Sequence, residues 1–438
     1  MSQKFIIEGG KTLGGEIDVR GSKNATTPIL AATLLTAEPC IIGNIPLIED
    51  VFKMINLIEK LGAEVSWIEE NKVKIVARDI DPKRLDRSLI AKMRSSILML
   101  GPLFARYGAV EMNHPGGCII GTRSVDTHLN GFRDLGADID IFQTGETAKE
   151  GTYKYSEKTN VYSLKANPNT KEREVVLDEF SVTATENIMM AAALSPYKTI
   201  IKMAACEPHI QELSKLLLKM GVDIKGAGTH TIEIIGKEKL GGVEYLVPYD
   251  YIEAGTYILM GLAVNGEIQV NNVPIRHLEL FFKKLSLFGA GIERRGETSV
   301  IIKASQKMKM SKVQALPHPG IATDLQSIFG VLATQTEGLT LIQDPLYDGR
   351  LKYLGELNKM GAEIIICDPH RAVISGPTKL YGTEVGPLDL RSGAALIIAG
   401  LIADGTSIIK NISQIDRGYE RIEERLINLG ASIKRVDV

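Results

Sequence analysis

The sequence predicts an α/β fold of six similar units, three in each of two domains. One motif, an apolar residue followed by glycine and then alanine or valine, recurs at intervals of roughly 70 residues, room for a few strands and two helices. An amphipathic segment precedes the motif, and each repeat holds a second, wholly apolar segment. The six copies are Leu61-Gly62-Ala63, Leu135-Gly136-Ala137, Met220-Gly221-Val222, Phe288-Gly289-Ala290, Met360-Gly361-Ala362 and Leu429-Gly430-Ala431.

The amphipathic segments predict surface helices. In 51–60, 207–219 and 419–428 the apolar residues fall at helical spacing. The glycine of the motif then stands where the end of a helix favours a left-handed residue. Short β-branched runs such as 74–76 and 231–235 follow and predict strands.

The apolar segments predict one buried helix in each repeat, because a helix that is apolar on all sides belongs in an interior. The predicted helices are 24–35, 94–105, 186–194, 253–264, 325–334 and 392–402. Their starts are polar, and three of them resemble capping boxes: Asp250-x-x-Glu253, Thr323-x-x-Gln326 and Thr183-x-x-Glu186. Three units packed around three buried helices make one domain, and six make two.

The domain boundary has to be inferred, since no Pro- or Ser-rich linker separates the halves. We place it near Gly21 and again near Pro248–Asp250. Residues 21–249 then form an inserted domain, and 1–20 with 250–438 form a second domain built from both termini.

Composition excludes several classes of protein. The 438 residues are 44% hydrophobic and 24% charged, with a formal net charge of -2, which gives no general attraction to nucleic acid or an anionic membrane. The four cysteines show no CxxC pair, so we expect neither a disulfide framework nor a zinc site. No run of about 18 apolar residues is present, so we expect no membrane insertion and a cytoplasmic protein.

Basic residues stand at the starts of three predicted buried helices: Lys23, Arg94 and Arg391. Each alone could be a solvated surface charge. A cation near a helix N-terminus is electrostatically unfavourable unless an anion is present, and these three occupy equivalent repeat positions. They therefore favour an anion site facing a cleft.

A lone cysteine follows two glycines in Pro115-Gly116-Gly117-Cys118, with Arg123 and Asp126 after it. A thiol beside a cation can act as acid, base or nucleophile, although a small hydrophobic residue in a turn is the alternative. We interpret Cys40, Cys206 and Cys367 as structural, because each lies in an apolar run or beside a predicted strand. Asp324, at the start of a buried helix, is either a cap or a functional carboxylate.

These segments resemble the enolpyruvyl transferase family over the whole chain. The matching pieces are Gly21-Ser22-Lys23-Asn24-Ala25, Met93-Arg94-Ser95-Ser96, Pro115-Gly116-Gly117-Cys118, Thr323-Asp324, Asp389-Leu390-Arg391 and Asp416-Arg417-Gly418-Tyr419. The resemblance implies a two-domain inverse α/β barrel of six βαβ-type repeats with its active site in the interdomain cleft. It implies phosphoenolpyruvate and UDP-N-acetylglucosamine as substrates, no metal or organic cofactor, and a monomer or weak homo-oligomer.

The resemblance also implies roles for individual residues. Cys118 would be the acid toward phosphoenolpyruvate and Asp324 the base for the acceptor hydroxyl. Phosphoenolpyruvate would be held by Lys23, Asn24, Arg123, Arg391 and Arg417, with Asn24 also near the acceptor. The UDP-sugar would contact Arg94, Arg123, Ser124, Val125, Asp126, Thr127, Ser181, Val182, Asp324 and Leu346.

The chain departs from the family pattern around the predicted acceptor site. Thr183 stands for a usual glycine, Ser124 and Ala322 stand for prolines, and Tyr251 stands for an arginine. Residues 347–351 also differ from the usual run. Two alternatives therefore stay open: an enolpyruvyl transferase with another hydroxyl acceptor, and a non-catalytic paralogue that binds a UDP-sugar as a regulatory module.

Overall fold

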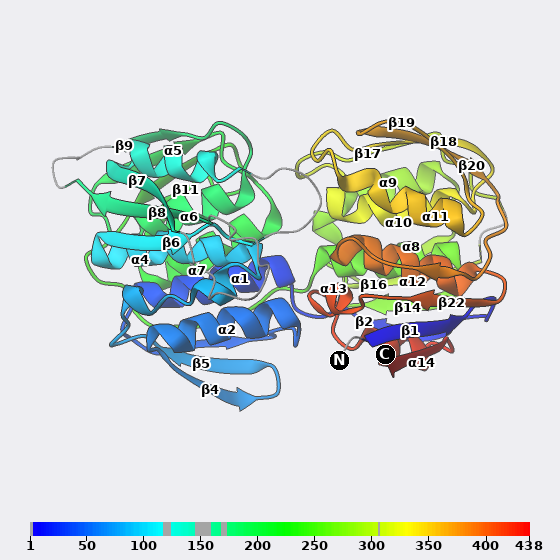
Figure 1. Ribbon diagram of the computed structural model, residues 1–438, viewed down its shortest axis with the longest axis horizontal. Helices are drawn as coiled ribbons and strands as arrows, with labels where there is room; N and C mark the ends of the chain where they lie inside the picture. Colours follow the sequence, from blue (N-terminus) through cyan, green and yellow to red (C-terminus); the bar gives the residue numbers. More distant parts are fainter. Residues whose placement is uncertain (1–2, 117–123, 145–158, 168–172, 305–306) are drawn as a thin grey trace, which may run out of the picture.

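A computed structural model describes residues 3–116, 124–144, 159–167, 173–304 and 307–438. The chain forms two lobes that lie side by side (Figure 1). Each lobe has its own hydrophobic core. The core of the central lobe runs from Ala25 to Val247, and the core of the terminal lobe combines Phe5–Val19 with Tyr251–Ile433.

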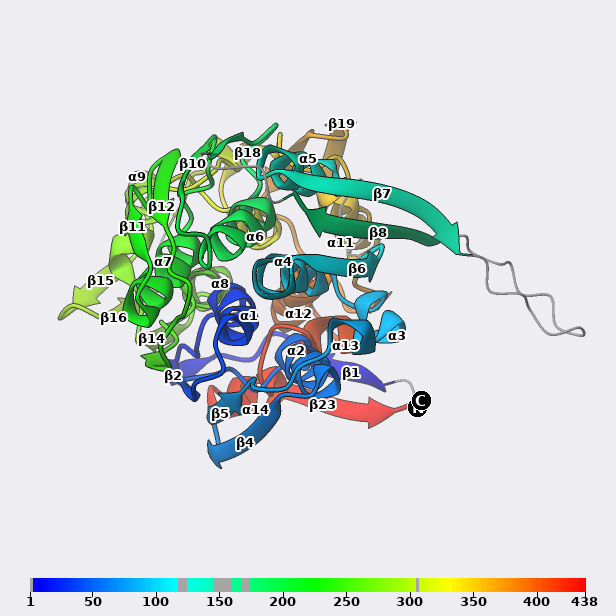
Figure 2. The same ribbon diagram turned by 90° about the vertical axis from the view of Figure 1, so that its left-hand side faces the viewer.

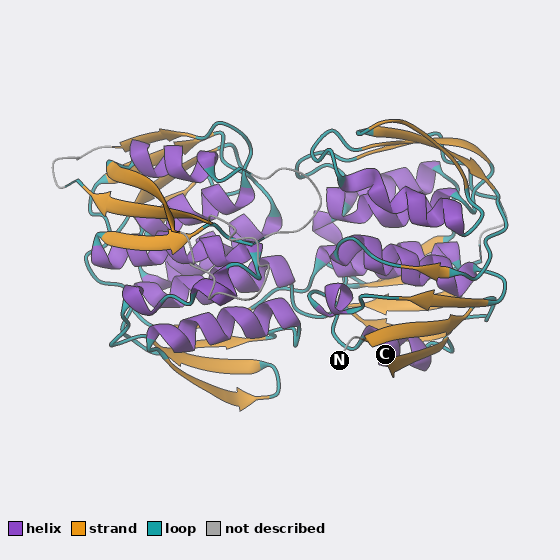
Figure 3. Ribbon diagram, in the orientation of Figure 1, coloured by secondary structure: helices purple, strands orange, loops and turns teal. Residues whose placement is uncertain are grey.

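The described strands form six separate sheets, three in each lobe, with the helices between them (Figure 3). In the central lobe the sheets are, in strand order, β13 (Val243–Leu246), β3 (Cys40–Gly43), β5 (Lys72–Val76), β4 (Glu64–Glu69); β6 (Ala109–Asn113), β8 (Thr159–Ala166), β7 (Ala137–Thr144); and β11 (Asp223–Lys225), β12 (Thr231–Ile235), β10 (Lys198–Lys202), β9 (Arg173–Val176). In the terminal lobe they are β21 (Glu384–Val385), β22 (Thr406–Ile409), β1 (Gln3–Glu8), β23 (Ser432–Asp437); β15 (Ile292–Arg295), β16 (Ser299–Ile302), β14 (Glu267–Asn271), β2 (Gly14–Asp18); and β17 (Lys312–Gln314), β18 (Gly338–Gln343), β20 (Arg371–Gly376), β19 (Glu363–Asp368).

Both parallel and antiparallel pairs occur in these sheets, and some join distant parts of the chain. Strand β3 pairs in parallel with β13, and β2 pairs in parallel with β14. The first and last strands, β1 and β23, are antiparallel neighbours, so both ends of the chain belong to the terminal lobe. The prediction of a two-domain α/β fold is confirmed; the described strands form open sheets, with no ladder joining one sheet to the next.

The six predicted buried helices are all present. They are α1 (Lys23–Ala32) continued by η1 (Thr33–Leu35), η3 (Arg94–Met99) continued by α4 (Leu100–Tyr107), α6 (Val182–Ala192), α8 (Tyr251–Ala263), α10 (Thr323–Ala333) and α12 (Leu390–Ile402). Figure 2 faces the central lobe, with α1, α4 and α6 in the middle and its three sheets around them. Two details differ: the first helix ends as a 3₁₀ segment at Thr33–Leu35, and the second begins as one at Arg94. Pro102 lacks an N–H and is accommodated in the first turn of the α-helix that follows.

The second helix of each repeat ends at the repeated glycine. These helices are α2 (Glu49–Leu61), α5 (Asp126–Asp134), α7 (Pro208–Met220), α9 (Glu279–Leu287), α11 (Leu354–Lys359) and α14 (Ile422–Asn428). Shorter helical segments are η2 (Pro82–Arg84), α3 (Arg87–Ile90), η4 (Ile275–His277), η5 (Arg350–Tyr353) and α13 (Ser413–Asp416). All six glycines have positive φ, from 82° at Gly289 to 113° at Gly221, which confirms the predicted left-handed helix ends.

The three predicted capping boxes do not form, because the side chains predicted to pair in them have other hydrogen-bond partners or positions. Asp250 does cap α8, but the Glu253 carboxylate accepts a hydrogen bond from Arg20 N at 2.6 Å instead of from the cap. Ser181, and not Thr183, caps α6. Thr323 is already inside α10, and its hydroxyl donates to Asp344. A complete box is formed by Asp389 and Ser392 at α12. Local sequence therefore predicted where the helices start, but contacts with distant residues determine which side chain caps each helix.

The two passages of the chain between the lobes run together. Gly21 and Tyr249 form an isolated antiparallel bridge, and Ser22 N donates to Pro248 O at 2.7 Å. We propose the domain boundary at these two passages, after residues 20 and 249. The two separate cores support this division. No helix within the described ranges is long and apolar enough to cross a bilayer.

Candidate active site

A cavity of about 720 Å³ lies where the two lobes meet. The central lobe contributes the starts of α1, η3 and α6 to its wall, and the terminal lobe contributes the starts of α8, α10 and α12. Six buried helices thus begin at one shared space. Helix starts present unpaired N–H groups and a positive partial charge, so this arrangement favours an anionic ligand.

Most of the predicted site residues line this cavity. They are Lys23, Asn24, Arg94, Ser124, Thr127, Ser181, Val182, Asp324, Leu346, Arg391 and Arg417. Val125 and Asp126 are not among the lining residues: Val125 is 5% exposed within the core, and Asp126 accepts a hydrogen bond from the Ser124 hydroxyl. Cys118 and Arg123 lie outside the described residues. The roles predicted for all of these residues remain proposals.

Asp50 joins two of the predicted cations across the lobes. Its carboxylate lies 3.2 Å from Lys23 Nζ of the central lobe and 3.0 Å from Arg417 Nε of the terminal lobe. Only 2% of the Asp50 side chain is exposed. Burial works against ionisation, but Lys23 and Arg417 outweigh it and lower the pKa of Asp50. The carboxylate therefore stays charged and holds the lobes together.

Replacing Asp50 with asparagine is expected to loosen the lobes. Two cations would then face each other without their anion, and breaking a buried ion pair in this way costs about 3–5 kcal/mol. The radius of gyration of the ligand-free protein, measured by small-angle scattering, should increase, and added inorganic phosphate should reverse the change. Glu49→Gln is the matched control, because Glu49 is on the same helix, is 52% exposed and, among the described residues, forms an ion pair with Lys53 alone. An unchanged radius in Asp50→Asn would contradict this role.

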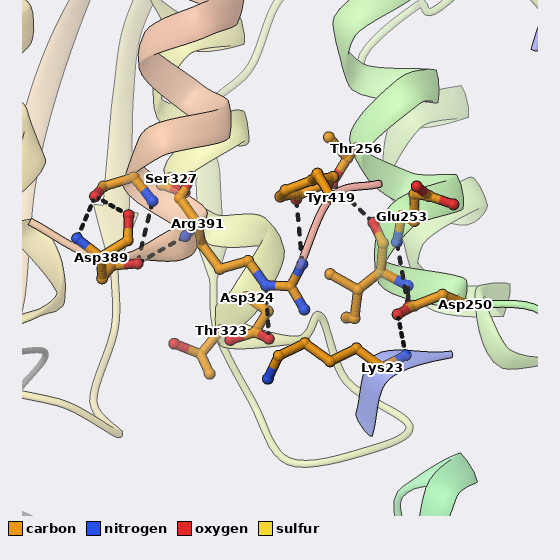
Figure 4. Close-up of polar contacts among 12 residues, drawn as sticks. Lys23, Asp250, Glu253, Thr256, Thr323, Asp324, Ser327, Asp389, Arg391 and Tyr419 are labelled. Carbon is orange, nitrogen blue, oxygen red and sulfur yellow. Dashed lines mark hydrogen bonds and ion pairs between the residues drawn. The ribbon is translucent and has the colours of Figure 1, made fainter. Parts of the chain in front are cut away.

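Asp324 forms the centre of a second charged cluster, within the terminal lobe. One carboxylate oxygen lies 2.9 Å from Arg391 Nε, and the other accepts a hydrogen bond from Arg350. Figure 4 shows Lys23 reaching from the other lobe toward Asp324 and Arg391. Burial raises the pKa of the carboxyl, but Arg391, Arg350 and Lys23 together hold the pKa of Asp324 well below its usual range. Asp324 is an anionic hydrogen-bond acceptor with 24% of its side chain exposed.

Arg391 retains unused hydrogen-bonding capacity. Its Nη1 donates to the Tyr419 hydroxyl at 3.2 Å and its Nε donates to Asp324. Its Nη2 is buried and has no hydrogen-bond partner among the described residues. A buried guanidinium N–H without an acceptor is costly, and an anionic ligand in the cavity would satisfy it.

Sequence reasoning missed Asp50 and Arg350. Asp50 lies in the first turn of an amphipathic helix, where an acidic residue is ordinary, and no local signal separates it from Glu49. Arg350 is 3% exposed and lies in the 347–351 run that departs from the family pattern. Arg350 itself keeps the residue usual at its position in that run, which was a usable signal.

A further group of ionisable side chains reaches the cavity: Glu186, Glu207 and His209. Burial, followed by repulsion from the Glu207 carboxylate, raises the pKa of Glu186 well above its usual value. Burial also raises the pKa of Glu207. Burial lowers the pKa of His209 to about 4. All three groups are therefore biased toward their neutral forms. The described part of the chain contains no cluster of three or more His, Cys, Asp or Glu side chains arranged to hold a metal ion.

The sequence model of the family described as EPSP synthase (3-phosphoshikimate 1-carboxyvinyltransferase) matches residues 7–426. The chain belongs to this enolpyruvyl transferase family. The match covers parts of both lobes and ends just before the sixth repeat motif at 429–431, and it includes every helix that opens on the cavity.

Individual relatives span the full length. A Treponema denticola protein named UDP-N-acetylglucosamine 1-carboxyvinyltransferase is 40% identical over 98% of this chain and 99% of its own. A Carboxydothermus hydrogenoformans protein, UDP-N-acetylglucosamine 1-carboxyvinyltransferase 2, is 41% identical over 99% of both chains.

Two solved enolpyruvyl transferase structures have the same fold as this chain. The enolpyruvyl transferase NikO from Streptomyces tendae superposes with a TM-score of 0.85 at 21% identity, covering 100% of this chain and 99% of that one. EPSP synthase from Acinetobacter baumannii superposes with a TM-score of 0.73 at 19% identity, covering 100% of both chains. At these identities the likeness extends to the fold alone.

Proposed function

We propose that this chain transfers the enolpyruvyl group of phosphoenolpyruvate to the 3-hydroxyl of UDP-N-acetylglucosamine and releases phosphate. This is the activity named for its relatives at about 40% identity over the full length. The observation that carries the proposal is the shared cavity. It brings Lys23, Arg391 and Arg417 together with Asp324 at the meeting of the lobes.

The reaction needs strong anion binding and three proton transfers: from the acceptor hydroxyl, to C3 of phosphoenolpyruvate and from C3. The acceptor oxygen forms a bond to C2 of phosphoenolpyruvate while its proton leaves and another proton is added to C3. The C2–O bond to phosphate then breaks, and loss of a proton from C3 restores the double bond. In this proposal Asp324 takes the hydroxyl proton. Cys118 delivers the proton to C3 in the addition step and, as the resulting thiolate, takes a proton from C3 when phosphate leaves. General acid and base groups each supply typically about 10²–10⁴-fold, and positioning and charge supply the remainder.

The charges of the cavity fit these two steps. Phosphoenolpyruvate brings a phosphate and a carboxylate. Lys23 and Arg417 supply positive charge in the cavity lining, and the buried Nη2 of Arg391 supplies an N–H donor. An anion on Arg391 also weakens the field that keeps Asp324 acidic, so ligand binding raises the basicity of Asp324 when it is needed. Asn24 and Arg123 complete the proposed phosphoenolpyruvate site, and no metal or organic cofactor is needed.

The proposal places the chain at the first committed step of peptidoglycan synthesis, in the cytoplasm, and so in cell-wall biogenesis and division. We expect a monomer or weak homo-oligomer whose substrates are two small molecules. The UDP-sugar would lie along Arg94, Ser124, Thr127, Ser181, Val182 and Leu346, which line the cavity, and along Arg123, Val125 and Asp126.

A second candidate keeps the chemistry and changes the acceptor. The departures Thr183, Tyr251 and Tyr347 all line the cavity, so they alter the surface that an acceptor meets. Tyr251 is 7% exposed, and its ring lies 6.3 Å from that of His277 and 6.5 Å from that of His318, where the family pattern has an arginine. These changes favour testing other nucleoside-linked hydroxyls.

Phosphate release separates the candidates. With phosphoenolpyruvate and UDP-N-acetylglucosamine, the proposed enzyme should release one phosphate per carboxyvinyl product, which mass spectrometry can identify. Release with another acceptor but not with this one would support the second candidate. UDP-sugar binding without release in either case would instead support a regulatory binding module.

A further inference from the structure

Thr183 is the second residue of α6 and lines the cavity. Among the described residues its hydroxyl has one hydrogen-bond partner, His128, with Thr183 Oγ1 at 3.0 Å from His128 Nε2. His128 is 1% exposed. If His128 donates this hydrogen bond, the threonine hydroxyl keeps its own proton for a hydrogen bond to a ligand.

The Asn187 side chain settles the direction. The backbone N–H of Gly101 donates to Asn187 Oδ1 at 2.8 Å, and Asn187 Nδ2 donates to the carbonyl of Ile97 at 2.9 Å. A backbone N–H can only donate and a carbonyl can only accept, so the orientation of the amide is unambiguous. A Cβ on Gly101 would lie 2.6 Å from the backbone oxygen of Asn187 and 3.0 Å from its Oδ1, so glycine allows this close approach.

The amide in turn sets the tautomer of His128. Asn187 Nδ2 lies 3.0 Å from His128 Nδ1 and points a hydrogen at it, so Nδ1 must be the unprotonated nitrogen. Burial and the charge of Arg94 lower the pKa of His128 to about 3, which keeps the ring neutral. Its single proton is therefore on Nε2 and is donated to Thr183 Oγ1.

The hydroxyl proton of Thr183 then has to point elsewhere. Oγ1 already accepts from His128, and no acceptor for the Thr183 hydroxyl is found among the described residues. One turn further along the same helix, Glu186 also lines the cavity, is 1% exposed and has an Oε1 without a hydrogen-bond partner. Two polar groups on one face of α6 thus lack the partners that a bound ligand would bring.

We propose that the Thr183 hydroxyl donates a hydrogen bond to a phosphate oxygen of the nucleotide-sugar acceptor. His128 and Asn187 are positioning residues that aim the hydroxyl into the cavity. The first N–H groups of α6 lack partners within the helix, which favours an anionic oxygen beside Thr183 over a neutral one. The inference rests on the proposed function for the identity of the acceptor, and it makes Thr183 a specificity-determining residue.

Two substitutions at Thr183 separate the hydroxyl from its bulk. Thr183→Val keeps the shape and removes the hydroxyl, so the dissociation constants of both UDP-N-acetylglucosamine and UDP, measured by calorimetry, should rise about 10–100-fold. Thr183→Ser keeps the hydroxyl and should change them by less than about threefold. The KM for phosphoenolpyruvate at saturating acceptor should stay within about twofold in both variants, whose melting temperatures are measured alongside.

Several results would overturn the inference: wild-type affinity in Thr183→Val, equal losses in Thr183→Val and Thr183→Ser, weakening toward UDP-N-acetylglucosamine but not UDP, or no binding of either by the wild type. If the wild-type protein binds both ligands but releases no phosphate, the proposed function is wrong. The affinities of Thr183→Val and Thr183→Ser would still test the role of the hydroxyl.

A measurement on the unmodified protein covers the case in which Thr183→Val does not fold. Nitrogen NMR of His128 should show a neutral ring protonated at Nε2, and UDP should shift that N–H signal. A proton on Nδ1, or a signal that UDP leaves unmoved, would contradict the proposed relay.

Discussion

Asp324→Asn is expected to lower turnover by about 10²–10⁴-fold, the range that a general base supplies. The amide can still accept a hydrogen bond from Arg391 or Arg350, but it cannot take the proton of the acceptor hydroxyl. Binding of UDP-N-acetylglucosamine should weaken much less, because Asp324 is one contact among many in a large cavity. Phosphate release and calorimetry measure the two effects separately.

The same substitution should destabilise the fold. Arg350 would keep Asp389, whose carboxylate is 3.6 Å from its Nη1, while Arg391 would lose its carboxylate partner. Removing one partner of a buried ion pair costs about 3–5 kcal/mol, so the melting temperature should fall. Asp348→Asn is the matched control: it makes the same change at an exposed aspartate of the neighbouring loop that does not line the cavity. Near-normal turnover in Asp324→Asn would remove Asp324 from the reaction.

Cys118→Ser is expected to reduce turnover by a similar factor, because a serine hydroxyl is a far weaker acid than a thiol. Binding of the UDP-sugar should persist. The epoxide fosfomycin should alkylate the wild-type protein at Cys118 alone, seen as a mass shift on the peptide that contains it.

The other thiols provide controls for this experiment. Burial raises the pKa of Cys40 to about 11, and burial and Glu207 raise that of Cys206, so both are poor nucleophiles. Cys367 is exposed on β19 and does not line the cavity. A general thiol reagent should therefore modify Cys367 without loss of activity, and Cys367→Ser should be fully active. A fosfomycin adduct on Cys367, or undiminished turnover in Cys118→Ser, would refute the assignment.

Much of the fold could be predicted from the sequence because the features that predict it involve residues close together in the chain. The left-handed glycine at each surface-helix end and the all-apolar character of the six inner helices depend on neighbours within one or two turns. Lys23, Arg94 and Arg391 were noticed for the same reason, as cations at predicted helix starts. Two inner helices include a 3₁₀ segment, at Thr33–Leu35 and at Arg94–Met99, and each of these helices contains a proline that was visible in the sequence, Pro28 or Pro102.

The partners of the charged groups were not visible in this way. Asp50 and Arg417 are 367 residues apart, and only the meeting of the lobes makes them a pair. Nothing near Asp324 in the chain indicates that Arg350 and Arg391 would keep it ionised, and nothing near Thr183 indicates that His128 would turn its hydroxyl toward a ligand.

By itself, the sequence determined six units and their helix ends, since both depend on short-range propensity or on a repeated pattern, and its matching motifs indicated the family by resemblance. Tertiary structure alone decided which charges neutralise one another and which polar atoms are left for a ligand. The physical reason is that burial, ion pairing and hydrogen-bond direction act through space, between residues that the chain order keeps far apart.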